Sequence, residues 1–256
     1  MKRDQQNHSI GFAAAVAALS LWIPVSGYAQ AQGQAPEAAK KPGWETSAAV
    51  GLTVTKGNSD TVTGTGNVIA QKKWERAELR LGADVTYGEN EGVKSAESYH
   101  AFGQYNKLLN ERVYGYFRAD GLHDDIADVQ YRITVGPGAG YYFIKKARTQ
   151  LSGEAGPSVV FERQGVGETT YFTLRVAERF EHKFNDKTRL WQSVEWLPQV
   201  DDFNNSIING ELGVETQLTE KFSLRLFAQD TYDNEPAPGR KRNDLKLVAQ
   251  LACKFL

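Results

Sequence analysis

The segment Ala77–Gly88 alternates apolar or small residues with polar residues or glycine over its whole length. Glu78, Arg80 and Asp84 all lie on the polar side of this alternation. A period of two residues is that of a β-strand with one apolar and one polar face. If such strands close into one sheet, the result is a membrane-spanning β-barrel with an apolar exterior and a wet interior.

Weaker copies of the same alternation recur through the chain and are separated by turn signals. They divide residues 44–256 into about twelve strands, within a range of ten to fourteen. The second, fourth, sixth, eighth and tenth connections are short, and the later odd-numbered ones are mostly longer. Outer-membrane barrels have this asymmetry, with short periplasmic turns and longer outer loops. We therefore expect an all-β fold, an antiparallel transmembrane β-barrel with both termini periplasmic.

The first 29 residues have the features of a secretory signal. Lys2 and Arg3 give a positive start, and Ile10–Ile23 is an apolar run rich in alanine. Gly27–Ala29 then offers the small residues that a signal peptidase needs. An uncleaved membrane anchor is the alternative, although a spanning helix needs about 20 apolar residues. The sequence predicts export to the bacterial outer membrane and three parts: a signal peptide over 1–29, a flexible linker over 30–43 and a barrel over 44–256.

The charge balance argues against one large class of partner. Without residues 1–29, the chain keeps 28 Lys and Arg residues against 30 Asp and Glu residues. Nucleic-acid binding usually demands a strong basic excess, so we expect no nucleic-acid partner. Mean hydropathy is −0.49, and no long apolar run follows residue 24, which predicts no transmembrane helix in the mature chain. Cys253 is the single cysteine, which excludes an intramolecular disulfide.

Aromatic residues are concentrated at the ends of the predicted strands. At the short-turn ends these are Trp44, Trp74, Phe143, Phe184, Trp191, Phe222 and Phe255. At the long-loop ends they are Tyr87, Tyr99, Tyr131, Phe161, Phe172 and Tyr232. This placement predicts two aromatic girdles at the two membrane–water boundaries. The alternative is the ordinary aromatic core of a soluble β-sandwich.

Charged residues recur on the inward faces of the predicted strands, with opposite signs on neighbouring strands. Opposite charges on adjacent strands stabilise a sheet, so these residues can form a network that only holds the barrel together. They can equally line a pore that selects solutes by charge. Both interpretations stay open for the lumen-lining candidates, which are Glu78, Arg80, Asp84, Arg118, Asp120, Arg132, Glu154, Arg175, Arg179, Glu195, Glu211, Glu215, Arg225 and Lys246.

Two segments resemble a known family. Lys56–Thr61 is similar to a Gly-Asn-Ser/Thr-Asp-Thr signature. Arg118–Tyr141 is similar to a second block, in which an Asp near a strand end is followed by a strand with the pattern Arg-x-x-x-Gly-x-Gly-x-Gly. The signature and the block are characteristic of the salt-induced outer membrane protein family, a bacterial domain of unknown function, which this chain therefore resembles. The resemblance covers roughly residues 44–256 and implies an outer-membrane barrel of a Gram-negative bacterium. It implies no reaction, substrate or catalytic residue.

The residues themselves predict no catalytic site, cofactor or metal. Gly136, Gly138 and Gly140 are spaced by two inside a strand, and no helix follows, as a phosphate-binding loop would need. We expect them to be inward positions that leave space in the lumen or let the sheet coil. The histidines after residue 29 lie on separate predicted strands without a hydrolase motif.

These observations favour a narrow channel for small polar solutes, or an envelope component in osmotic stress. The expected partners are membrane lipid, lipopolysaccharide and the outer-membrane assembly machinery, and the oligomeric state stays open. A soluble periplasmic barrel or sandwich that binds a ligand is the first alternative. A barrel enzyme that acts on lipid is the second.

Overall fold

The computed structural model describes residues 43–255, with gaps at 58–60 and 91–92. The predicted signal peptide, and the predicted linker up to residue 42, lie outside the described residues. Within the described part of the chain, no helix has the length and apolar character needed to cross a membrane.

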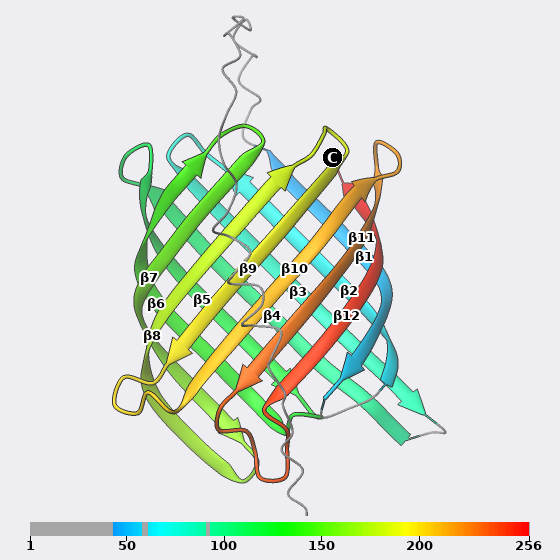
Figure 1. The fold of residues 1–256 in the computed structure, drawn as a ribbon, viewed down its shortest axis with the longest axis vertical. Helices are drawn as coiled ribbons and strands as arrows, with labels where there is room; N and C mark the ends of the chain where they lie inside the picture. Colours follow the sequence, from blue (N-terminus) through cyan, green and yellow to red (C-terminus); the bar gives the residue numbers. More distant parts are fainter. Residues whose placement is uncertain (1–42, 58–60, 91–92, 256) are drawn as a thin grey trace, which may run out of the picture.

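The described chain forms one closed antiparallel barrel of twelve strands (Figure 1). Each strand pairs with its sequence neighbour, and β1 pairs with β12 to close the sheet. The predicted antiparallel barrel and its strand number are thereby confirmed. The strands are β1 (Trp44–Lys56), β2 (Thr61–Lys73), β3 (Ala77–Asn90), β4 (Val93–Leu108), β5 (Val113–Asp124), β6 (Val129–Lys145), β7 (Thr149–Gln164), β8 (Gly167–Lys183), β9 (Thr188–Pro198), β10 (Ser206–Gln217), β11 (Phe222–Asp233) and β12 (Asn243–Phe255).

The two edges of the barrel carry different connections. The short-turn edge, at the top of Figure 1, holds the connections that precede β3, β5, β7, β9 and β11. Both described chain ends lie at this edge, because Thr46 of β1 pairs with Phe255 of β12. The opposite, long-loop edge carries the β11–β12 connection over 234–242 and the β9–β10 connection over 199–205.

One connection at the long-loop edge is a tight turn. β7 and β8 stay paired out to Gln164 and Gly167. Gly165 and Val166 alone join the two strands, and Gly165 takes the left-handed φ of 57° that such a tight turn needs. The resulting hairpin extends past the rim at the long-loop edge (Figure 1).

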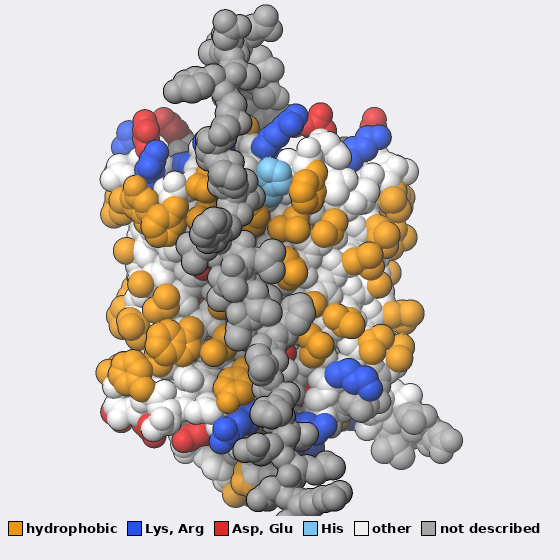
Figure 2. Space-filling view, viewed as in Figure 1, with side chains coloured by type: hydrophobic (Ala, Val, Ile, Leu, Met, Phe, Trp, Pro, Cys, Tyr) orange, Lys and Arg blue, Asp and Glu red, His pale blue; other side chains and the backbone are white. Residues whose placement is uncertain are grey.

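The outer face of the wall is apolar. Outward side chains such as Val50, Leu52 and Phe172 are 69%, 61% and 67% exposed. Figure 2 shows hydrophobic side chains in an upper and a lower band, with charged side chains at the two rims. Because successive side chains of a strand point to opposite faces, the polar members of each alternation point into the lumen.

The structure places ten of the predicted girdle residues on the outer surface, more than one third exposed: Trp44, Trp74, Tyr87, Tyr99, Phe143, Phe161, Phe172, Phe184, Phe222 and Phe255. Tyr131 and Tyr232 are half-buried near the long-loop edge. The assignment of Trp191 to the girdle is wrong, because Trp191 is only 9% exposed and its Nε1 donates to Glu211 in the lumen. On β9, Trp191 lies at alternate positions with Arg189 and therefore shares its inward face.

Candidate functional site: the barrel lumen

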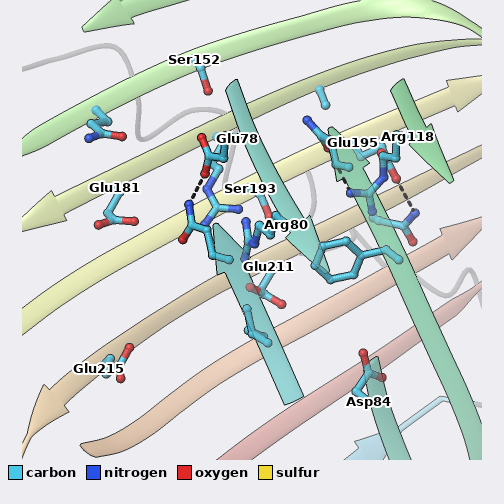
Figure 3. Close-up of a pocket in the computed structure, with 18 of the residues that line it drawn as sticks. Glu78, Arg80, Asp84, Arg118, Ser152, Glu181, Ser193, Glu195, Glu211 and Glu215 are labelled. Carbon is cyan, nitrogen blue, oxygen red and sulfur yellow. Dashed lines mark hydrogen bonds between the residues drawn. The ribbon is translucent and has the colours of Figure 1, made fainter. Parts of the chain in front are cut away.

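The barrel encloses a cavity of about 1100 Å³. All fourteen lumen-lining candidates line this cavity, and Figure 3 shows several of them pointing into it from the surrounding strands. The alternation of each strand was sufficient to place these side chains, because a period of two fixes the face. The structure adds which of them contact one another.

Arg175 of β8 is the centre of one ion-pair cluster. Its Nη1 lies 2.8 Å from Glu154 Oε2 on β7, and its Nε lies 2.5 Å from Glu195 Oε1 on β9. Tyr114 Oη and Gln104 Nε2 each donate to Glu154 Oε1 at 2.8 Å. A charge removed from bulk water needs partners of this kind, because an unpaired buried charge is strongly unfavourable. This cluster links β4 and β5, on one side of β6, to β7, β8 and β9 on the other side.

The glycines of β6 explain how Tyr114 reaches across that strand. A Cβ at Gly140 would overlap the ring of Tyr114, and a Cβ at Gly138 would overlap the ring of Tyr116. The tyrosine rings of β5 therefore lie flat over β6, where no side chain stands. Gly138 and Gly140 therefore face inward, and the tyrosine rings take the space that they leave, whereas a Cβ at Gly136 would overlap Pro157 O of β7.

A second chain of contacts links β3, β4 and β5. His100 Nδ1 lies 2.8 Å from Asp84 Oδ1, and His100 Nε2 lies 3.1 Å from Asp120 Oδ1. Asp120 also accepts from Arg118 at 2.6 Å. Because an ionised carboxylate only accepts hydrogen bonds, both ring nitrogens of His100 act as donors in this arrangement. The strand alternation predicts the two acids and Arg118 in the lumen, and His100, which was not among the predicted lumen residues, shares their face.

A third cluster lies toward the short-turn edge. Arg189 of β9 contacts Glu215 at 2.6 Å and Glu181 at 3.1 Å, and Arg225 lies 3.3 Å from Glu215. Neither Arg189 nor Glu181 was among the predicted lumen residues. The alternation could have found both, since each lies on the same strand face as a residue that was selected.

The β11–β12 connection lies at the long-loop end of the lumen, and we call its residues 234–242 the cap. Arg132 of β6 pairs with Glu162 and, at 2.6 Å, with Asp233, the last residue of β11 before the cap. β6 and β11 are not neighbours in the sheet, so the Arg132–Asp233 contact crosses the barrel. At the tip of the cap, Ala237 is only 3% exposed.

The cap also contacts the β7–β8 hairpin across the mouth. A Cβ placed on Gly165 would lie 3.6 Å from Pro238 Cδ and 3.8 Å from Ala237 Cβ. Figure 1 shows the cap beside this hairpin at the lower rim. The buried Glu162 and Tyr171 lie beyond the residues that line the cavity. The described residues of the cap are not among those that line the cavity, whereas the lining continues to the lysines of the short-turn rim.

Two lumen arginines differ from the others. Within the described residues, neither Arg80 nor Arg179 has a carboxylate within ion-pair distance. Arg80 lies 5.5 Å from the centroid of the Phe102 ring, which also contacts Arg118 at 4.9 Å. These two guanidinium groups keep hydrogen-bonding capacity for water or a solute in the cavity.

Known structures share this architecture. The NanC porin matches with a TM-score of 0.57 and 6% sequence identity, over 81% of this chain and 100% of that chain. The KdgM porin in complex with disordered oligogalacturonate matches with a TM-score of 0.49 and 6% identity, over 82% and 99% of the two chains. The translocator domain of autotransporter NalP from Neisseria meningitidis matches with a TM-score of 0.49 and 9% identity, over 85% and 90%. No curated protein sequence matches the chain.

At 6% identity, the similarity to the NanC porin concerns the fold alone: the two chains share a closed β-barrel. At the level of sequence, one family model matches residues 48–255, and its description does not include salt induction. That match spans nearly all of the described barrel, and the chain therefore belongs to the family described as protein of unknown function, DUF481.

Proposed function

We propose that the chain is an outer-membrane channel for small polar solutes, with its short-turn edge in the periplasm. The observation that carries the proposal is the combination of a charged cavity of about 1100 Å³ with an apolar outer wall. An exposed apolar face between two bands of aromatic residues fits a hydrocarbon layer, and a polar lumen fits water. A soluble ligand-binding barrel would expose that apolar face to water, which is unfavourable.

The two interpretations of the charged lumen residues apply to different members of the set. Arg132, Arg175 and Arg189 each contact two carboxylates, and these contacts support the wall and the cap. Arg80 and Arg179 line the same cavity without such a pair among the described residues. We assign the first group a structural role and the second group contact with the solute.

The cap makes this channel a gated one. With the long-loop end closed, solute passes only when residues 234–242 leave the mouth. The contacts that hold the cap include the Arg132–Asp233 pair at its base and the approach of Ala237 to Gly165 at its tip. Between them, the Asn234 N–H donates to the Ser206 carbonyl at 3.0 Å, and Lys241 Nζ donates to the Gly57 carbonyl at 2.7 Å. We expect short openings between long closed periods.

The proposal is tested by reconstituting the full chain in planar lipid bilayers and recording single-channel currents. Discrete steps of current are expected, together with a folded band that shifts in gel mobility on heating. Correctly folded protein that gives no current steps, with the cap either native or released, would overturn the channel. Release of the protein from cells by osmotic shock, without detergent, would support the soluble alternative instead.

Two further expectations belong to this proposal. Lipopolysaccharide is the lipid that we expect around the long-loop edge, and the assembly machinery is expected to insert the barrel. A role in salt stress rests on the family resemblance, and it predicts slower growth of a deletion strain at high salt. A lipid-acting enzyme is the remaining alternative, and a lipid-hydrolysis assay that stays at background would exclude it.

A further inference from the structure

The rim of the lumen at the short-turn edge is rich in lysine. Six lysines from four strands and two turns line the cavity at this rim, and all six are exposed: Lys73, Lys145, Lys183, Lys187, Lys221 and Lys254. We call this set the lysine collar. Figure 2 shows basic side chains along this rim, above the upper hydrophobic band.

The positive charges of the collar are not neutralised by direct contact with carboxylates of the described residues. Within the described part of the chain, none of the six ammonium groups has a carboxylate within ion-pair distance. Lys145 donates to the Glu111 carbonyl and lies over the Tyr142 ring, and neither partner bears a negative charge in these contacts. The acidic side chains that line the cavity at the same rim are fewer, namely Glu45, Glu78, Asp186 and Glu220, and Glu78 is the register partner of Lys73. The mouth therefore has a basic excess.

Deeper in the lumen, most arginines lie in contact with a carboxylate, with Arg80 and Arg179 as the exceptions among the described residues. Arg175 is held between Glu154 and Glu195, and Arg189 contacts two carboxylates in the same way. Such pairs have a weak field at a distance, because their charges are opposite and close. The long-range field that a solute meets on approach is thus set by the collar rather than by the paired interior.

We propose that the lysine collar makes the short-turn mouth selective for anions, so that the transported solutes are small inorganic or organic anions. This inference rests on the proposed channel function and adds the solute class to it. A mouth lined by cations raises the local concentration of anions and excludes cations. Because the collar is in contact with solvent, its effect falls with ionic strength: the Debye length is about 10 Å at 0.1 M and about 3 Å at 1 M.

The test is the reversal potential in a KCl gradient, measured on the full chain with the cap released by Asp233→Asn. Chloride is expected to be preferred over potassium several-fold near 0.1 M, and the preference is expected to shrink toward unity near 1 M. Because only one mouth has the collar, current should also differ between the two voltage polarities. Replacement of all six collar lysines by Gln is expected to abolish both effects.

A matched control removes the same number of positive charges from the same edge without touching the lumen. Its substitutions to Gln fall on basic residues that do not line the cavity: Lys72, Arg76, Lys107, Arg112, Lys146 and Arg148. This control should retain chloride preference. A channel that conducts but prefers potassium, or that keeps its chloride preference without the collar, would overturn the inference and leave the channel standing.

A second measurement does not depend on conduction. Binding of a small sulfonated dye to the detergent-solubilised full chain can be followed by fluorescence anisotropy. The collar variant should bind the dye several-fold more weakly than the native chain, and the control variant should bind it as the native chain does. Equal binding by all three proteins would contradict an anion site at this mouth, whatever the bilayer recordings give.

Discussion

Loss of the Arg132–Asp233 ion pair should open the long-loop mouth. Asp233→Asn keeps the size of the side chain and its acceptor oxygen for the Glu235 N–H, but it removes the charge that faces Arg132 at 2.6 Å. The side chains of Arg132 and Asp233 are 8% and 13% exposed, so the pair is largely buried. Breaking a buried pair by removing one partner typically costs about 3–5 kcal/mol.

The expected magnitude follows from that cost. Arg132 keeps Glu162 as a partner, which favours the lower end of the range. About 3 kcal/mol, applied to the closed state, changes the ratio of open to closed channels by about a hundredfold, since each 1.4 kcal/mol is a factor of ten. Single-channel open probability in planar bilayers measures this ratio. Asp201→Asn is the control, because Asp201 is exposed on the neighbouring β9–β10 connection and contacts Gln199 rather than the cap.

A disulfide should have the opposite effect. A Cβ on Gly165 would lie 3.8 Å from Ala237 Cβ, which is the usual separation in a disulfide. The double variant Gly165→Cys and Ala237→Cys, made with Cys253→Ala, should close the channel when oxidised and conduct again after reduction. Either single-cysteine variant should be insensitive to oxidant. A locked channel that conducts as often as the reduced one, or an Asp233→Asn channel no more open than its control, would refute a gate at this loop.

Three other predictions concern the wall and the rim. Arg175→Ala should lower the free energy of unfolding in urea by about 3–5 kcal/mol, because Glu154 and Glu195 lose their shared partner, whereas Arg148→Ala at the exposed rim should not. Gly138→Ala should lower it by about 1–3 kcal/mol through overlap with Tyr116, whereas Gly115→Ala, whose Cβ would be 3.9 Å from its nearest neighbour, should be tolerated. In the β5–β6 connection, the hydrogen bond from Lys94 lowers the pKa of Asp125 below its usual value. Because the pKa of Asp125 is lower in the folded protein than in the unfolded chain, its contact with Lys94 stabilises the fold at neutral pH. This stabilisation is lost as pH falls below about 4. In the variant Lys94→Met, NMR titration should show the pKa of Asp125 return toward its usual value.

The faces of the strands could be predicted from the sequence with little ambiguity. In β3, the alternation around Glu78, Arg80 and Asp84 assigns these side chains to one face, and the closed sheet makes that face the lumen. The error at Trp191 arose where position near a strand end was given more weight than alternation. Its neighbours Arg189 and Glu195 on alternate positions already indicated the inward face.

The partners of those side chains could not be predicted in the same way. Alternation fixes a face but not the height of a residue in the barrel, and it says nothing about contacts between strands that do not pair. The link from Tyr114 to Glu154 needs the bare glycines of β6 beneath the ring, and the sequence pattern alone allowed several reasons for those glycines.

The sequence by itself determined a barrel with an apolar outside and a charged inside, because the two-residue period is a local property of the backbone. The tertiary structure alone decided that the cap contacts the β7–β8 hairpin at one end of the lumen. Arg132 and Asp233 are 101 residues apart in the chain, and their contact depends on closure of the whole sheet and on the path of the cap. No periodic pattern in the sequence can indicate such a contact, since its two residues belong to strands on different sides of the barrel.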